Sequence, residues 1–299
     1  MVAYMDHKDL ANDTIDDARR QEIVDGVHRV LDGIAAAESD AGHAAGSVRL
    51  LAATKTRDVG EIMAAIDAGV RMIGENRPQE IEVKAPGLVR QCAVRGFALG
   101  EAANDGTDDA QAAAAAVANA GAADAASGST ASVPAALAPL PFHLIGQLQS
   151  NKINKVLPHV TTIESVDNLA LAQKIAKRAE ARGLTVGVLL EVNESGEESK
   201  SGCEPAEAAD LAAQIAELKG LHLEGLMTIG AHVPDEAVIR RGFAHLRETR
   251  DALLASGVPV LADCRELSMG MTHDMAIAIS EGSTIVRVGT AIFGERAFI

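Results

Sequence analysis

Short apolar runs alternate along the chain with longer segments in which apolar residues recur every three or four positions. Continuous runs rich in Val, Ile and Leu are typical of strands buried inside a parallel sheet. Eight such runs predict strands at Val48–Thr54, Val70–Gly74, Phe142–Ile145, Val160–Ile163, Val186–Val192, Leu223–Thr228, Glu266–Met269 and Thr284–Val288. The segments between them have the spacing of amphipathic helices that pack on a sheet.

A helix is predicted after nearly every strand, and one more before the first strand. The leading helix is expected at about 14–38, where Ile23, Val27 and Val30 recur at helical spacing. The other helices are predicted at Val59–Ala68, Pro78–Lys84, Ser150–Val156, Asp167–Arg182, Pro205–Leu218, Asp235–Ala255 and Met271–Glu281. This order favours an α/β fold, a single-domain (β/α)8 TIM barrel with an extra N-terminal helix. A doubly wound open sheet is the alternative, but it usually has fewer strands and no leading helix.

Two segments do not follow the alternation. Residues 1–13 are polar and are expected to form a flexible N-terminus before a barrel at 14–299. An insertion at about 99–139 is low in complexity and rich in Ala, with runs such as AQAAAAAVANAGAADAASGSTAS. Its few large apolar side chains cannot bury enough surface to offset the entropy lost on ordering, so we expect it to be disordered. About 250 residues remain without it, the usual size of such a barrel.

Composition limits the classes of function. The chain has 299 residues, a formal net charge of −15 and 2% aromatic residues, which argues against binding to nucleic acid or to anionic membranes. Without a signal peptide or a long apolar stretch, it is expected to be cytoplasmic and soluble. The three cysteines, Cys92, Cys203 and Cys264, lack the spacing of a zinc site or a disulfide framework, so we expect no metal.

Polar residues at the carboxyl ends of strands are the candidates for chemistry, because a TIM barrel places its active site there. Lys55 ends the first apolar run. A partly buried lysine loses its proton readily and forms an imine with an aldehyde. Taken alone, Lys55 would more often be a solvated surface charge, and the other strand ends decide between the two interpretations. Plain alternatives also exist for its neighbours at other strand ends: Asn76 as a helix cap, His143 as a core histidine, Lys200 as a solvated charge and Asp274 as a first-turn helix acid.

The last two strand ends have the character of a phosphate site. The stretch from Ser268 to Thr272 supplies hydroxyls and a glycine and leads into a predicted helix, and Gly289-Thr290 supplies a second pair. Barrels commonly bind phosphate after strands seven and eight. Arg287 should face the side of its strand opposite to Val286 and Val288, where it could meet a ring nitrogen or a carboxylate. Tight turns and a structural ion pair are the alternatives.

Several stretches together resemble the pyridoxal-phosphate homeostasis proteins, the YggS/PROSC group. These proteins look like the barrel half of fold-type III enzymes such as alanine racemase. The matching stretches are LLAATKTRDVGEI, IGENRPQEIEVK, FHLIGQLQSNKINKVL, IESVDN, EVNESGEESKSG, GLMTIG, LSMGMTHDM and STIVRVGTAIFGER. They cover about residues 48–84 and 141–296. The chain departs from the family mainly at Phe142, where many relatives have Trp, and in the Ala-rich insertion.

The resemblance implies a cofactor, pyridoxal 5'-phosphate (PLP), held by Lys55 as an internal aldimine. It further implies phosphate binding by Ser268, Thr272, Gly289 and Thr290, an arginine near the pyridine nitrogen at Arg287, and a cavity lined by Asn76, Asn193 and Met227. A cation beside the ring nitrogen discourages its protonation, because like charges repel. That weakens the ring as an electron sink and narrows the reactions open to it.

Three functions are consistent with this interpretation. The leading hypothesis is a carrier without catalytic activity, which buffers PLP in the cell and delivers it to apo PLP-dependent enzymes, as a monomer or weak dimer. The alternative is a fold-type III amino-acid racemase or decarboxylase. A racemase of this class needs a second base, however, and the only tyrosine is Tyr4, in the polar start. A cofactor-free barrel aldolase that uses Lys55 is the third possibility.

Overall fold

Eight parallel strands close into a barrel in the computed structural model, which describes residues 9–100, 137–197 and 200–295. In barrel order the strands are β1 (Arg49–Ala53), β10 (Ile285–Val288), β9 (Glu266–Ser268), β8 (Leu221–Met227), β7 (Val186–Glu191), β6 (Thr162–Val166), β5 (Phe142–Leu144) and β2 (Ile73–Glu75). Each overlaps a strand predicted from the sequence, with bounds that differ by a few residues. The predicted barrel is confirmed.

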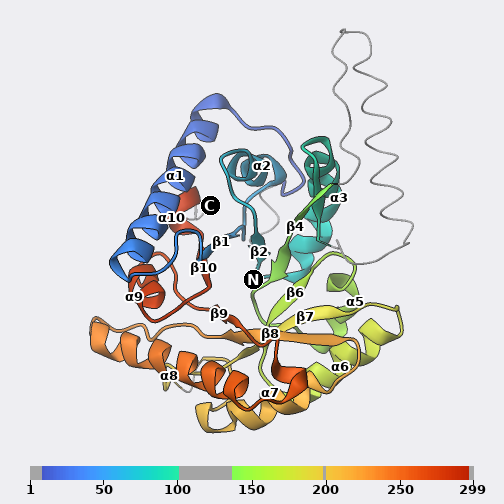
Figure 1. Ribbon diagram of the computed structural model, residues 1–299. Helices are drawn as coiled ribbons and strands as arrows, with labels where there is room; N and C mark the ends of the chain where they lie inside the picture. The colour runs from blue at the N-terminus through green and yellow to red at the C-terminus, as the bar shows by residue number, and fades with distance from the viewer. Residues whose placement is uncertain (1–8, 101–136, 198–199, 296–299) are drawn as a thin grey trace.

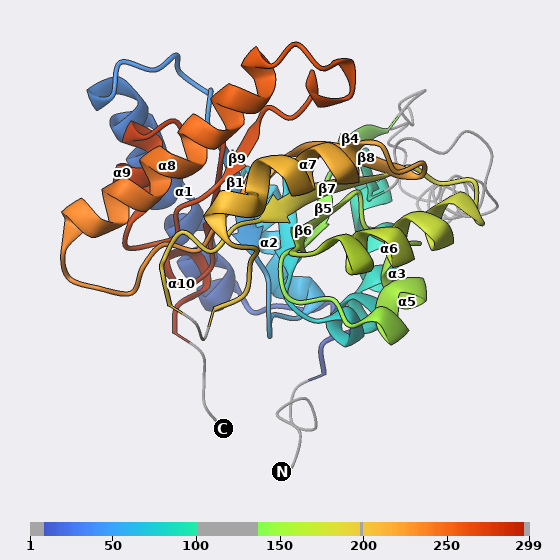
Figure 2. The same cartoon turned by 90° about the horizontal axis from the view of Figure 1, so that it is seen from below.

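Helices cover the outside of the barrel (Figures 1 and 2). They are α1 (Asp17–Asp40), α2 (Val59–Asp67), α3 (Pro78–Val94), α5 (Ile153–Val156), α6 (Leu169–Glu180), α7 (Ala208–Ala216), α8 (Glu236–Ala255), α9 (Met275–Ser280) and α10 (Thr290–Phe293). The extra leading helix, α1, packs against α2, α9 and α10. Helix α1 therefore contacts both the first helix of the barrel, α2, and the last two, α9 and α10.

The apolar core lies mainly between the barrel and the helices. Ile62, Ile81 and Leu88 belong to this layer and are fully buried. Burial of such side chains stabilises the fold by roughly 1.5–3 kcal/mol each. A separate, small apolar cluster forms around Leu51 and Ile285. Much of the remaining barrel interior is polar, which leaves charged groups available beneath the carboxyl ends of the strands.

Helix α3 is longer than the sequence indicated. It continues beyond the expected end at Lys84 to Val94, although Pro86 lies inside it. An internal proline removes one helical hydrogen bond and usually disfavours a helix. Leu88 and Cys92, on the far side of Pro86, are fully buried, and this packing outweighs the local preference.

The edges of the Ala-rich insertion are structured. Strands β3 (Phe97–Leu99) and β4 (Ala138–Leu140), which the sequence did not predict, pair in parallel as a separate two-stranded sheet. The expected insertion at 99–139 therefore overlaps these strands at both ends. Residues 101–136, which make up most of it, lie outside the described residues.

Part of the expected flexible start is also packed. Leu10 is buried, and its carbonyl accepts a hydrogen bond from the Val59 amide at 3.3 Å. A Cβ atom at Gly60 would lie 2.6 Å from the carbonyl oxygen of Thr14, so only glycine allows this approach. Residues 1–8 lie outside the described part of the chain. Among the described helices, none has the length and apolar character needed to cross a membrane.

Candidate functional site

Lys55 lies in a tight turn directly after β1 and is half-buried. The Arg57 amide donates to the carbonyl of Thr54 at 3.0 Å and closes a four-residue turn around the lysine. Within this turn Thr56 has a φ of 65°. A positive φ at the third position is the feature of a type II turn, where glycine is the usual residue. Lys55 is thus held in a hydrogen-bonded turn in which the next residue has an unfavourable backbone conformation.

Barrel register brings the expected phosphate residues beside Lys55. Ala52 of β1 pairs with Val288 of β10, so Gly289 and Thr290 follow β10 next to the turn that carries the lysine. A Cβ atom at Gly289 would lie 3.0 Å from the carbonyl oxygen of Ala53. The glycine therefore permits the close approach of the two strand ends.

A second glycine turn follows β9, the other neighbour of β10. Gly270 has a φ of 95°, and a Cβ atom there would lie 2.5 Å from the Cβ of Ala278. Asp274 accepts a hydrogen bond from the Met271 amide at 2.6 Å. The helix predicted from Met271 consequently begins later, at Met275, and Thr272 lies half-buried in the preceding turn.

Arg287 and Ser268 belong to a buried hydrogen-bonded chain inside the barrel. The Ser268 hydroxyl donates to Glu164 Oε2 at 2.6 Å and accepts from Arg287 Nη1 at 2.7 Å. Arg287 Nη2 also donates to the carbonyl of Thr228 at 2.8 Å. The expected inward direction of Arg287 is thus observed, together with an ion-pair distance of 4.0 Å to Glu164.

The Ser268 hydroxyl is fully engaged by these interior groups. It orients Arg287, and its expected part in phosphate binding stays a prediction. Glu164 went unrecognised because the predicted strand stopped at Ile163, whereas β6 continues to Val166.

The opposite end of this chain is His143, whose Nδ1 lies 2.7 Å from Glu164 Oε1. Burial alone would raise the pKa of Glu164, but the hydrogen bond from His143 and the charges of His143 and Arg287 lower it below the usual value. His143 is buried, as a core histidine would be. Its partner Glu164 is nevertheless joined to Arg287 through the Ser268 hydroxyl.

The expected cavity-lining residues differ in their surroundings. Asn76 follows β2, and its Oδ1 atom is buried without a hydrogen-bond partner. It does not cap α3, whose N-cap is Arg77. The Asn193 side chain is held within its own loop, where its Nδ2 donates to the carbonyl of Glu197 at 3.0 Å. Met227 is buried at the end of β8.

Two further charged residues lie at strand ends. Glu191 is buried at the end of β7, and burial raises its pKa to about 7, with nearby Asp167 acting in the same direction. Lys200 is more than a solvated charge, because its Nζ lies 2.7 Å from Glu197 and donates to the carbonyl of Gly230 at 2.9 Å. Lys200 therefore joins the segment that follows β7 to the segment that follows β8.

Two hollows of the surface are lined by other residues. One of about 700 Å³ is lined at the ends of β5 and β6 by polar groups that include Gln147 and Asn151. Another of about 520 Å³ lies between the start of α1 and α2. Lys55 lines neither, so the candidate site is defined by the converging strand ends. The cysteines Cys92, Cys203 and Cys264 are free and buried. Within the described ranges, no group of three or more His, Cys, Asp or Glu is placed to hold a metal ion.

The donor set suits PLP. The half-buried Lys55 offers an amine to the aldehyde. The hydroxyls of Thr272 and Thr290, with the close approaches at two glycines, suit the phosphate, and the buried Arg287 suits the ring nitrogen. The unsatisfied Asn76 oxygen adds a polar atom that lacks a protein partner.

Known proteins are similar to this chain. Residues 39–297 match the family model described as alanine racemase, N-terminal domain. The pyridoxal phosphate homeostasis protein of Vibrio cholerae is 35% identical over 278 residues, which cover 93% of this chain and 98% of that protein. The homeostasis protein of Escherichia coli is 34% identical over 279 residues, with the same coverage. The chain belongs to the family of pyridoxal phosphate homeostasis proteins. The resemblance inferred from the sequence motifs is thereby confirmed.

Solved structures agree with the family assignment. A Bifidobacterium adolescentis protein described as unknown has 66% identity and a TM-score of 0.83, with 96% of this chain and 100% of that chain covered. PipY of Synechococcus elongatus with PLP bound has 29% identity and a TM-score of 0.59, with coverage of 87% and 100%. An alanine racemase of Clostridium difficile, at 13% identity and a TM-score of 0.59, shares the fold; the match covers 94% of this chain and 57% of the racemase.

Proposed function

We propose that this protein binds PLP through Lys55 and acts in intracellular PLP homeostasis, as a carrier rather than a catalyst. The observation that carries the proposal is the placement of Lys55 in a defined turn beside Gly289 and Thr290. PipY, which shares the family and the fold, has been solved with PLP bound. When bound, PLP supplies an aldehyde with which a lysine amine condenses, with loss of water.

The residues around the turn would divide the binding between them. Thr272 and Thr290 offer hydroxyls to the phosphate, and the glycines beside them allow backbone amides to approach it. Arg287 is held in place by Ser268 and Thr228, so its guanidinium would meet the ring nitrogen without moving. A fixed positive charge at that nitrogen disfavours ring protonation. This arrangement supports storage of the cofactor over chemistry on it.

The comparison with curated relatives supports a role in homeostasis, because the match covers 98% of the pyridoxal phosphate homeostasis protein of Vibrio cholerae. The Clostridium difficile racemase, at 13% identity, shares only the fold. The chain's single tyrosine, Tyr4, lies outside the described residues. In this proposal the protein delivers PLP to apo PLP-dependent enzymes. It acts in the cytoplasm, as a monomer or a weak dimer.

Absorption spectroscopy with a lysine variant tests the binding. The wild-type protein mixed with PLP should develop a yellow band, and borohydride reduction should fix the cofactor on the peptide that contains Lys55. Lys55→Ala should lose both signals, because it removes the amine. Lys177→Ala, which changes an exposed lysine on α6, serves as the control and should behave as the wild type. Retention of the fixed cofactor in Lys55→Ala would refute the assignment.

Isotope exchange separates carrier from enzyme. Amino acids incubated with the loaded protein in deuterium oxide should keep their α-hydrogen over many hours, and PLP should pass to an added apo-enzyme. Rapid and stereospecific loss of the α-hydrogen would instead establish the racemase alternative.

A further inference from the structure

Helix α3 and the end of β2 together form a buried cluster of three ionisable side chains that the proposed cofactor site does not use. Lys84 Nζ lies 2.5 Å from Glu75 Oε1 and 2.9 Å from Glu80 Oε2. All three side chains are at most 1% exposed. Glu75 ends β2, whereas Glu80 and Lys84 are one helical turn apart on α3. Such buried charges are costly to place, because burial removes the water that would solvate them.

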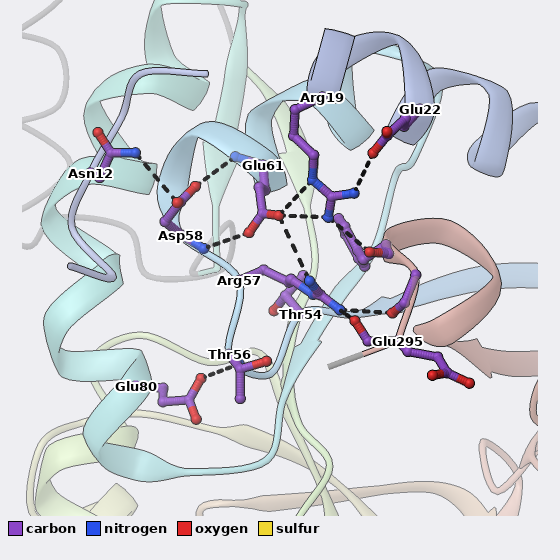
Figure 3. A network of polar contacts seen from close by, with 12 residues as sticks. Asn12, Arg19, Glu22, Thr54, Thr56, Arg57, Asp58, Glu61, Glu80 and Glu295 are labelled. Carbon is purple, nitrogen blue, oxygen red and sulfur yellow. Dashed lines mark hydrogen bonds and ion pairs between the residues drawn. The ribbon is translucent and has the colours of Figure 1, made fainter. Parts of the chain in front are cut away.

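The cluster contacts the backbone on both sides of Lys55. Lys84 Nζ donates to the carbonyl of Thr54 at 3.0 Å. Glu80 Oε2 accepts from the Thr56 amide at 2.7 Å (Figure 3). The Thr54 hydroxyl also donates to Glu75 Oε1 at 2.7 Å. The residue before Lys55 and the residue after it are therefore each fixed by this cluster.

Thr56 explains why such fixation is needed. Its φ of 65° lies in the left-handed region, which is unfavourable for a residue with a branched Cβ. Without outside bonds the turn would relax to another conformation and turn the lysine away from the strand end. The Glu80 carboxylate accepts a hydrogen bond from the amide of Thr56 itself, and the positive φ of Thr56 sets the direction of this amide.

Geometry distinguishes Glu80 from Glu75. The Oε2 atom of Glu80 accepts hydrogen bonds from both Lys84 Nζ, at 2.9 Å, and the Thr56 amide, at 2.7 Å. Glu80 therefore links the buried lysine directly to the residue that follows Lys55.

We propose that Glu80 and Lys84 are positioning residues, which hold the strained turn so that Lys55 points into the barrel mouth ready for the cofactor. This inference rests on the proposed attachment of PLP to Lys55. Glu82, which lies on the same helix between them, bonds Lys155 at the surface and provides a matched control.

The test compares PLP binding by Glu80→Ala, Glu82→Ala and the double variant Glu80→Ala/Thr56→Gly. Glu80→Ala should bind PLP about tenfold more weakly, because the left-handed conformation is no longer compensated. Glycine adopts a positive φ without strain, so Thr56→Gly should restore most of the lost affinity. Glu82→Ala should match the wild type. Glu80→Gln, which keeps an acceptor oxygen, should fall between the wild type and Glu80→Ala and covers the case in which Glu80→Ala does not fold.

Thermal unfolding of the apo-proteins separates positioning from stability. A purely structural role would lower the midpoint of Glu80→Ala, and Thr56→Gly would not restore binding; that result would overturn the inference. Equal affinity of Glu80→Ala and Glu82→Ala would overturn it as well. If the wild-type protein itself acquires no PLP on Lys55, the proposed function fails instead, so the two failures are distinct.

Discussion

At the scale of single residues, the barrel interior concentrates buried carboxyl groups. Glu191, at the end of β7, is 4% exposed, and burial raises its pKa to about 7. In the unfolded chain a glutamate titrates near its ordinary value. The folded state therefore binds this proton more tightly, and its stabilising effect is complete at low pH and lost as pH rises through about 7.

Glu191→Gln should consequently stabilise the protein at pH 8 and leave it nearly unchanged at pH 4. An amide of the same shape removes the need to ionise a buried acid, which is worth about 1–3 kcal/mol above the folded pKa. Urea unfolding at both pH values measures the difference. The exposed Glu217→Gln is the control, and an equal gain at both pH values would contradict the explanation.

Glu75, Glu80 and Lys84 show what periodicity misses at this scale. In a helical pattern, charged residues are read as solvent-facing. The spacing of four between Glu80 and Lys84 was a signal of pairing, yet only the packing of α3 under the Lys55 turn makes the pair interior. Lys55 itself was recognisable because it ends an apolar run, a purely local feature.

At the scale of elements, the turn after β9 depends on one glycine. Sequence spacing predicted a helix from Met271, but the positive φ of Gly270 and the Asp274 bond to the Met271 amide postpone it to Met275. Helix boundaries of this kind depend on cap geometry, which periodicity does not encode. The strands were easier to predict, because each is a continuous apolar run in a buried sheet.

Gly270→Ala should destabilise the protein by about 1–3 kcal/mol and weaken PLP binding. The new Cβ would meet Ala278 at 2.5 Å, and the backbone conformation is unfavourable for alanine. Thermal unfolding and a PLP titration measure both effects. Gly33→Ala, inside α1 and near only the flexible end of Met275, should be neutral or slightly stabilising. A loss of stability in Gly33→Ala as large as that in Gly270→Ala would argue against the backbone explanation.

At the scale of the whole molecule, a polar network joins the first helix to the last (Figure 3). Arg19 on α1 bonds Glu61 on α2 at 2.6 Å and the carbonyl of Phe293 on α10 at 2.8 Å. Arg57, next to the Lys55 turn, donates to the carbonyl of Gly294 at 2.8 Å. These long-range contacts could not be read from the sequence, because the partners are separated by up to 274 positions. The overall barrel could, since it follows from the order of strands and helices.

Arg19→Met should lower the free energy of unfolding by about 1–3 kcal/mol, because it removes a partner from Glu61 and from a backbone carbonyl. Lys155→Met, which breaks an exposed pair with Glu82, should change it by at most about 1 kcal/mol. Denaturant unfolding gives both values. Equal losses would show that the network adds nothing beyond a surface ion pair.

The pairing of β1 with β10 also sets an order in time. During synthesis Lys55 leaves the ribosome early. Gly289 and Thr290, and the Gly294 carbonyl that accepts a hydrogen bond from Arg57, leave it about 230 residues later in the numbering of the chain. Until then β1 lacks its neighbour on one side, and the phosphate half of the proposed site does not exist. We therefore expect the complete proposed site to form only after β10 has been synthesised, so a growing chain should hold the cofactor less tightly than the folded protein.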